Sequence, residues 1–373
     1  MSIANKLARK ELIDMVPYQS ARRLYASSGA MQGKIWLNAN EASGPGIYQV
    51  NSDSINRYPD FQPENLINAY SQYCALPAEN ILATRGADEG IELIIRTFCQ
   101  AYQDSILICP PTYGMYAISA ENHGADIIKV PLTSELSLDL PGLKAQVGKT
   151  KVVFLCSPGN PTGNLLSQQD IKMTLELFED SAIVVVDEAY IEFSPEQSVA
   201  SWLKAYPHLV ILRTLSKAFA LAGLRCGFTL ANKDIITMIS KVIAPYPISA
   251  PVADIASEAL AQSGLEKMSI RVQETDILRT QLATWLAEQS WCSQVFNSDA
   301  NFVLLRCQNE DMKNFIFNSL AEQGILIRDQ SKQFNLADCL RISIGSEREL
   351  SLLQQTITLS FTTSTAQPVT KEN

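Results

Sequence analysis

The chain has 373 residues, of which 46% are hydrophobic and 18% charged, a composition typical of soluble globular proteins. This length allows one large domain with a smaller one beside it. Acidic residues outnumber basic ones by 39 to 30, and the net charge of −9 argues against a surface that binds nucleic acid or anionic lipid as a whole. An anionic ligand would therefore need a local pocket of arginine or lysine.

The same composition indicates where the protein works. No apolar stretch approaches the roughly 20 residues that span a bilayer, and the N-terminus lacks the apolar core of a signal peptide. The eight cysteines are scattered without a CxxC pair, which favours reduced, buried thiols, and two histidines are too few for a histidine-rich metal site. We expect a soluble, cytoplasmic protein without a metal or a membrane partner.

Short β-branched runs alternate with amphipathic segments over the first two thirds of the chain. Helices are expected at 87–101, whose isoleucines share one face, and at 167–180, which begins at the N-cap residue Ser167. Segments such as Ala182–Val186 are apolar on both faces, as strands covered by helices on both sides must be. The pattern predicts an α/β domain with a mainly parallel mixed sheet sandwiched by helices. Its expected strands are 81–84, 106–109, 126–130, 151–156, 182–187, 209–213 and 225–230.

The pattern changes after residue 245, where Pro245, Pro247 and Pro251 interrupt it. A long helix is expected over about 252–289, and a helix around 310–322 lies among the remaining strands, which indicates a smaller α+β domain. Those strands are expected near 301–306, 324–328 and 340–344. We divide the chain into an N-terminal arm (1–30), a large domain (31–245), a small domain (246–361) and a tail expected to be disordered (362–373).

Candidate functional residues follow three successive strands, at the carboxyl edge where α/β proteins bind ligands. Asn160 lies in Ser157-Pro-Gly-Asn-Pro-Thr-Gly163, Asp187 ends the next strand shortly before Tyr190, and Lys217 follows the strand after that. Taken singly, the first segment fits an ordinary turn and the acid fits a helix cap. A carboxylate at the end of an apolar strand is nevertheless costly unless a cation pairs with it.

Together these residues supply what pyridoxal phosphate chemistry requires: a Schiff-base lysine, an acid opposite the pyridine nitrogen and a phosphate site. Apolar neighbours would lower the pKa of Lys217 and make its amine a nucleophile toward carbonyl groups. Ser216 and Arg225 could bind a phosphate. Upstream, Arg85-Gly-Ala-Asp-Glu89 opens a helix whose backbone N–H groups are suited to the same anion.

In this order the motifs resemble the aspartate-aminotransferase superfamily, the fold-type I pyridoxal phosphate enzymes. Within it, further segments resemble the histidinol-phosphate aminotransferase family, and they cover nearly the whole chain except the C-terminal tail. One departure is Gly159, where these enzymes are expected to have asparagine. The matching segments are Pro17-Tyr18-Gln-Ser-Ala-Arg-Arg23, Leu37-Asn-Ala-Asn-Glu41, Arg57-Tyr58-Pro59, Arg85-Gly-Ala-Asp-Glu-Gly90, Pro111-Thr-Tyr113-Gly, Arg213-Thr-Leu-Ser-Lys217-Ala-Phe and Leu340-Arg341-Ile.

The resemblance implies roles around pyridoxal 5'-phosphate. Lys217 would form the Schiff base and shuttle a proton, and Asp187 would pair with the pyridinium nitrogen. Tyr190, with Asn160, would hydrogen-bond the phenolic oxygen, so that Lys217, Asp187 and Tyr190 are the catalytic residues. Tyr113 would stack on the ring, although a tyrosine in this turn could equally pack in the core. The remaining cofactor contacts implied are Ala87, Asp88, Thr214, Ser216 and Arg225, with Tyr58 reaching the phosphate from a second subunit.

Substrate contacts are implied in the same way. Arg341 would bind the amino-acid carboxylate in bidentate geometry. Histidinol phosphate lacks this carboxylate and has a phosphate instead, so one pocket must accept both it and glutamate. Arg328 and Tyr18 resemble the additional phosphate contacts of the family, and Asn40 is a further substrate contact. Arg328 could instead form a surface ion pair with the neighbouring Asp329.

The implied activity is a homodimeric, pyridoxal phosphate-dependent transamination. L-Histidinol phosphate and 2-oxoglutarate would give imidazole-acetol phosphate and glutamate, in L-histidine biosynthesis, with no nucleic acid partner. One alternative is a related decarboxylase of a phosphorylated amino acid such as threonine phosphate, which would share the cofactor machinery. Another is a non-enzymatic regulator built on this domain, although such proteins usually have an added DNA-binding domain and only about 30 residues precede the first motif strand here.

Overall fold

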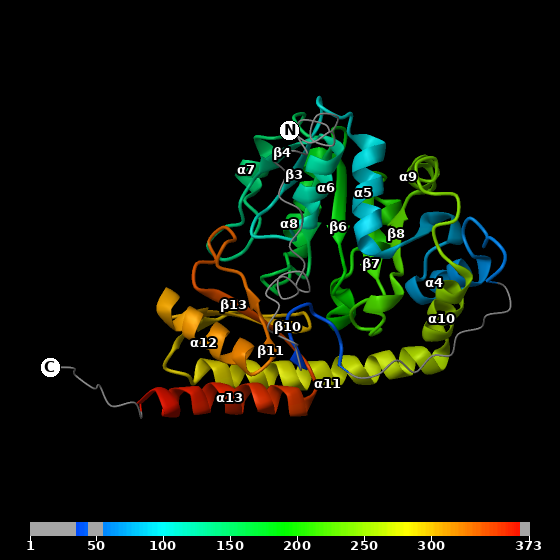
Figure 1. Cartoon of the computed structure of the whole chain (residues 1–373). Helices are drawn as coiled ribbons and strands as arrows, with labels where there is room; N and C mark the ends of the chain where they lie inside the picture. The colour runs from blue at the N-terminus through cyan, green and yellow to red at the C-terminus, as the bar shows by residue number, and fades with distance from the viewer. Residues whose placement is uncertain (1–34, 44–54, 366–373) are drawn as a thin grey trace, which may run out of the picture.

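A computed structural model describes residues 35–43 and 55–365, and these residues form two larger sheets with helices around them and a third sheet of two short strands (Figure 1). The larger sheet has seven strands in the order β2-β8-β7-β6-β5-β3-β4. All neighbouring pairs are parallel except those of β8, which runs antiparallel to both β2 and β7, so the predicted mainly parallel mixed sheet is confirmed. Its strands are β2 (Ile81–Thr84), β3 (Ser105–Ile108), β4 (Asp126–Lys129), β5 (Val152–Cys156), β6 (Ile183–Asp187), β7 (Leu209–Thr214) and β8 (Gly227–Ala231).

Helices cover both faces of this sheet, because alternate residues of its central strands are apolar on both sides. In β5, Val153 and Leu155 belong to one buried cluster, and Val152 and Phe154 belong to another on the opposite face. The helices with residues in the first cluster are α4 (Glu64–Cys74), α7 (Leu140–Lys144), α8 (Gln168–Phe178) and α10 (Ala250–Leu260). Those with residues in the second are α5 (Gly86–Phe98), α6 (Met115–His123) and α9 (Lys233–Ile239).

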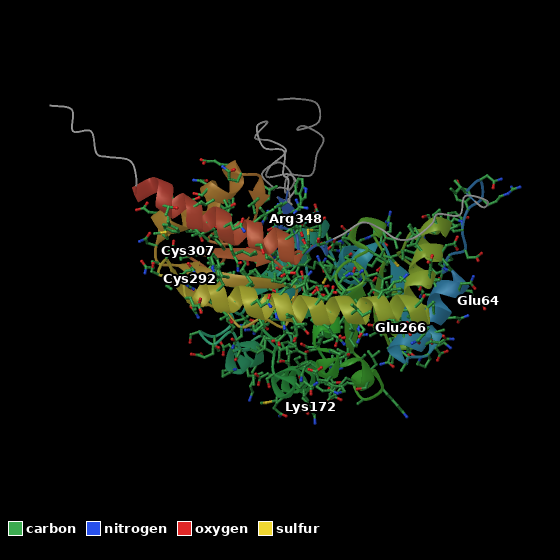
Figure 2. All side chains as sticks on the ribbon, turned by 90° about the horizontal axis from the view of Figure 1, so that it is seen from below. Glu64, Lys172, Glu266, Cys292, Cys307 and Arg348 are labelled. Carbon is green, nitrogen blue, oxygen red and sulfur yellow. The ribbon has the colours of Figure 1, made fainter. Side chains whose placement is uncertain are left out.

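The second sheet is antiparallel, in the order β12-β13-β10-β9, and belongs to the predicted α+β part of the chain. One face, including Leu305 and Ile342, packs with three helices into a separate core. From below, α13 lies beside α11, and Glu266 of α11 lies toward the end where Glu64 marks α4 (Figure 2). The elements are α11 (Gln262–Ala287), β9 (Cys292–Val295), β10 (Phe302–Cys307), α12 (Glu310–Glu322), β12 (Arg328–Asp329), β13 (Cys339–Ser343) and α13 (Glu347–Thr365).

Two predicted elements are wrong in detail. The helix expected over 252–289 is divided between α10 and α11, because Ala261 is extended (φ −70°, ψ 162°) and the chain turns there. The turn is tight: a Cβ on Gly264 would lie 2.2 Å from the carbonyl oxygen of Ala259. The strand expected over 324–328 is two short strands, β11 (Ile325–Leu326) and β12, which pair with different partners.

Two chain segments also cross the predicted domain limits. The strand β1 (Ile35–Trp36), placed by the sequence analysis in the large domain, pairs in parallel with β11 and packs with the small-domain core. Helix α13 continues to Thr365, into the tail expected to be disordered from 362, and its buried Leu350, Leu353 and Ile357 explain why it docks. The predicted arm (1–30) lies outside the described residues. Within the described ranges, no helix is both long and apolar enough to cross a membrane.

Gly227 provides a test of how closely β8 and α5 approach each other. A Cβ at this position would lie 2.6 Å from the carbonyl carbon of Gly86 and 2.7 Å from the amide nitrogen of Ala87, and these backbone atoms cannot rotate away. Gly227→Ala should therefore lower the free energy of unfolding by about 1–3 kcal/mol in urea titrations. Gly223→Ala is the matched control, since its Cβ would meet nothing within 4 Å. Equal urea midpoints for the two variants would contradict this account.

Candidate active site

A cavity of about 430 Å³ lies at the carboxyl ends of β5, β6 and β7, between the large sheet and β12 and β13. Most of the predicted site residues line it. Tyr58 does not line this cavity in its own chain, and Tyr18 lies outside the described residues. The predicted residues that line it are Asn40, Ala87, Asp88, Tyr113, Asn160, Asp187, Tyr190, Thr214, Ser216, Lys217, Arg225, Arg328 and Arg341.

Lys217 extends into the cavity from the turn that follows β7. Its Nζ donates to the carbonyl oxygen of Ala39 at 3.4 Å and lies 5.5 Å from the centre of the Tyr190 ring. Burial, together with the positive charge of Arg341, lowers the pKa of Lys217 to about 8. A substantial share of this amine is therefore unprotonated near neutral pH, as attack on a carbonyl carbon requires.

Asp187, the last residue of β6, is a buried carboxylate without a cation. Its oxygens accept hydrogen bonds from Tyr116 Oη at 2.6 Å and from the amide of Ala189 at 3.0 Å. Burial raises the pKa of Asp187 to about 6, although both hydrogen bonds oppose the shift. The neighbouring Glu188 instead forms an ion pair with Arg213 at 2.8 Å. Among the described residues, the arginine near the end of this strand therefore neutralises Glu188 and not Asp187. A positively charged ring nitrogen beside Asp187 would supply the missing partner.

Tyr190 is held with its hydroxyl at the cavity wall. Its oxygen accepts hydrogen bonds from Asn40 Nδ2 at 2.9 Å and from Asn160 Nδ2 at 3.2 Å. These two bonds occupy the acceptor positions of the phenol, and its own proton stays available to a ligand oxygen. The Asn40 amide is itself fixed, because its Oδ1 accepts from Ser343 Oγ at 3.0 Å. Asn40 therefore positions Tyr190, whether or not it also contacts substrate as predicted.

The N-terminus of α5 forms an anion site at one end of the cavity. No side chain caps this helix, so Ala87 and Asp88 present first-turn N–H groups at its positive end. Arg225 Nη2 lies 3.1 Å from Asp88 Oδ2, and Tyr113 Oη donates to Asp88 Oδ1 at 2.9 Å. Thr214 Oγ1 donates to Ser216 Oγ at 2.8 Å on the facing turn. The predicted phosphate contacts thus meet at one place.

Two arginines define the opposite end. Arg328 of β12 and Arg341 of β13 are directly paired across the antiparallel ladder. Like charges in this arrangement destabilise a sheet unless an anion lies between them. Arg341 donates from Nη1 to Asn160 Oδ1 at 2.5 Å, which connects this end to Tyr190. The alternative ion pair of Arg328 with Asp329 is wrong, because Asp329 points to the other face of the strand and pairs with Lys313 at 3.0 Å.

The sequence analysis missed Tyr116, the hydrogen-bond donor to Asp187. No local pattern marked it, because Tyr113 lies before α6 and the partner of Tyr116, Asp187, lies 71 residues further along the chain. It also missed Gln330 and Gln333, which line the cavity after β12. The two histidines contact backbone carbonyl oxygens: His123 Nε2 lies 2.8 Å from that of Cys99, and His208 Nε2 lies 3.0 Å from that of Leu175.

Comparisons with known proteins agree with this geometry. Residues 32–357 match the family model "Aminotransferase class I and II". The chain therefore belongs to the class I and II aminotransferases. Curated relatives include the histidinol-phosphate aminotransferases of Colwellia psychrerythraea, 65% identical over 362 residues (94% of this chain, 98% of the relative), and of Yersinia enterocolitica, 52% identical over 344 residues (92% and 90%). Within the class, the chain belongs to the histidinol-phosphate aminotransferases.

Solved structures extend the comparison to the fold. The histidinol-phosphate aminotransferase from Sinorhizobium meliloti in complex with pyridoxal-5'-phosphate superposes with a TM-score of 0.84 over 96% of this chain and 98% of that chain, at 23% identity. The fold is thus that of known aminotransferases. The residues present here also fit such a cofactor, because no cation forms an ion pair with Asp187 and no side chain caps the N-terminus of α5 among the described residues.

The buried Asp187 gives a pH-dependent prediction for protein from which any cofactor has been removed. Its pKa rises from 3.8 to about 6 on folding, so its contribution to stability is complete below about pH 4 and is lost as the pH rises through 6. Asparagine cannot ionise. Asp187→Asn should therefore be more stable than wild type at pH 7.5, by on the order of 3 kcal/mol, with the difference shrinking toward pH 5. Urea titrations of both cofactor-free proteins between pH 5 and 7.5 measure this, and a pH-independent difference would contradict it.

Proposed function

We propose that the chain is a cytoplasmic, homodimeric enzyme that transfers the amino group of L-histidinol phosphate to 2-oxoglutarate, using pyridoxal 5'-phosphate. The products are imidazole-acetol phosphate and glutamate, and the reaction belongs to L-histidine biosynthesis. One observation carries the proposal: the Lys217 amine and the Asp187 carboxylate, both with pKa values shifted by burial, line one cavity with a pair of arginines at its far end.

The residues divide the chemistry among themselves. Pyridoxal phosphate, when bound, supplies an electron sink for the bond that is broken. Asp187 would hold the proton on the ring nitrogen, and Tyr190 would donate its remaining proton to the phenolic oxygen. Lys217 would bind the cofactor carbonyl carbon and later move the proton between the two carbons that exchange the amino group. The α5 N-terminus, Ser216 and Arg225 would hold the phosphate.

The arginine pair can account for the binding of both the phosphate of histidinol phosphate and the carboxylate of glutamate. A phosphate dianion offers enough charge for both Arg328 and Arg341, whereas the carboxylate of glutamate needs only one bidentate guanidinium. The additional contact by Tyr18 remains a prediction outside the described residues. Decarboxylation of threonine phosphate is not favoured, because relatives that are 52–65% identical over nine tenths of the chain are histidinol-phosphate aminotransferases. The same relatives are enzymes, which disfavours a regulator.

The exposed segment around Tyr58 supports a shared site. The Tyr58 ring is 82% exposed and stacks on Tyr246 with ring centres 4.5 Å apart. Ile55 and Phe61 are also exposed in this segment. Large exposed apolar side chains in one patch are typical of interaction surfaces. We infer that this segment contacts a second subunit and brings Tyr58 to the phosphate site of that subunit.

The activity can be tested directly on purified protein with pyridoxal phosphate. L-Histidinol phosphate should support formation of glutamate from 2-oxoglutarate, and Lys217→Ala should reduce the rate by several orders of magnitude, because both carbonyl binding and proton transfer depend on this amine. Lys241→Ala, which removes an exposed lysine that does not line the cavity, is the control. Carbon dioxide release from threonine phosphate, without turnover of histidinol phosphate, would refute the proposed function.

The shared site can be tested by mixing two inactive or weakened chains. A heterodimer of a Tyr58→Phe chain and a Lys217→Ala chain has one site with Lys217 and the partner's intact Tyr58. That site should regain wild-type cofactor affinity, whereas the Tyr58→Phe homodimer should bind cofactor roughly tenfold to a hundredfold more weakly for loss of one hydrogen bond to a charged phosphate. A verified heterodimer that binds cofactor no better than the Tyr58→Phe homodimer would show that the tyrosine does not cross between subunits.

A further inference from the structure

A buried glutamine beside the arginine pair has no part in the chemistry described so far. Gln330 directly follows β12, is only 5% exposed and lines the cavity. Its backbone amide donates to the carbonyl of Cys339 at 2.9 Å and so extends the pairing of β12 with β13. Successive residues of a strand point to opposite faces. Gln330 therefore shares its face with Arg328, while Asp329 between them points away to Lys313.

The side chain of Gln330 is held in one orientation. Gln333 Nε2 donates to Gln330 Oε1 at 3.1 Å, and the backbone of Gln333 donates to the carbonyl of Gln330 at 3.0 Å. This arrangement uses the oxygen of the Gln330 amide. Its Nε2 group has no hydrogen-bond partner among the described residues, although the side chain is almost completely buried. Because Gln330 lines the cavity, this amide group is open to it and free to donate to an oxygen of a bound ligand.

The two proposed substrates differ in what they can accept at this end of the cavity. A carboxylate has two oxygens, which a single bidentate arginine can saturate. A phosphate monoester has three terminal oxygens and close to two negative charges. Arg328 and Arg341 balance that charge, so a further donor has to be neutral if the site is not to become positive overall. A glutamine amide meets this condition.

We propose that Gln330 is a specificity-determining residue that donates from Nε2 to a phosphate oxygen of the substrate. It favours the phosphorylated substrate over glutamate, because the carboxylate that glutamate places at the arginine pair has no third oxygen. Gln333 is a positioning residue that acts through Gln330. This inference rests on the proposed function, because it takes a phosphate ester as the substrate.

The test compares three amino donors on the holoenzyme: L-histidinol phosphate, L-histidinol without the phosphate, and L-glutamate. Gln330→Leu removes the donor with little change in volume. We expect kcat/KM for histidinol phosphate to fall tenfold to a hundredfold, mainly through KM, as loss of one hydrogen bond to a charged group predicts. The values for histidinol and glutamate should change less than threefold. Lys332→Ala, an exposed neighbour that removes a positive charge from the same turn, is the control and should leave all three unchanged.

A second variant keeps the test decisive if Gln330→Leu folds poorly. Gln333→Leu leaves Gln330 in place but frees its amide to rotate, and should produce the same selective loss at threefold to tenfold. Equal losses for all three donors, or no loss in either variant, would overturn the role of Gln330 while leaving the proposed function intact. A wild-type enzyme that transaminates glutamate but not histidinol phosphate would overturn both.

Discussion

The charge of Asp187, buried at the end of an apolar strand, is the constraint on which the site depends. Two adjacent acids, Asp187 and Glu188, lie at the end of β6, and their negative charges are compensated in different ways. Glu188 is neutralised inside the fold by Arg213 and by hydrogen bonds from Ser198 Oγ and the Val199 amide. Asp187 receives only neutral donors from the described residues. The cost of that burial is recovered when a cationic group binds, so the same residue weakens the empty protein and strengthens the loaded one.

A chain of hydrogen bonds connects the arginine end of the cavity to Tyr190 and joins the small sheet to the large one. Arg341 of β13 contacts Asn160 after β5, and Asn160 contacts Tyr190 after β6. Tyr190 is held from its other side by Asn40, which Ser343 of β13 fixes in turn. The chain thus begins and ends on one small-domain strand and passes through two turns of the large domain. A ligand that displaced the Arg341 side chain would therefore also disturb the hydrogen bonds that hold the Tyr190 hydroxyl.

Sequence patterns predicted the strands of the large sheet because these are long, apolar and bounded by turn residues. They also predicted that Asn160, Asp187 and Lys217 lie near each other, because the carboxyl ends of parallel strands meet at one edge, and these residues line one cavity. Tyr116 was missed because its partner Asp187 lies 71 residues further on. The separation of β11 from β12 was missed because β11 pairs with the distant β1 while β12 pairs with β13, and the pattern of two-residue segments does not reveal their partners. The contact of Tyr58 with a partner subunit is still a prediction.

The pairing of β1 with β11 has a consequence for protein synthesis. Ile35 lies opposite Ile325, and Trp36 lies opposite Leu326. β1 can therefore pair only after the ribosome has synthesised about 290 further residues. The stretch that follows β1 supplies the carbonyl of Ala39 to Lys217 and the amide of Asn40 to Tyr190. Until β11 has been synthesised, β1 has no strand to pair with, and the stretch that makes these contacts is not held in place. The cavity therefore acquires its full set of walls only when nearly the entire polypeptide has emerged, and truncated chains lack an assembled reaction centre.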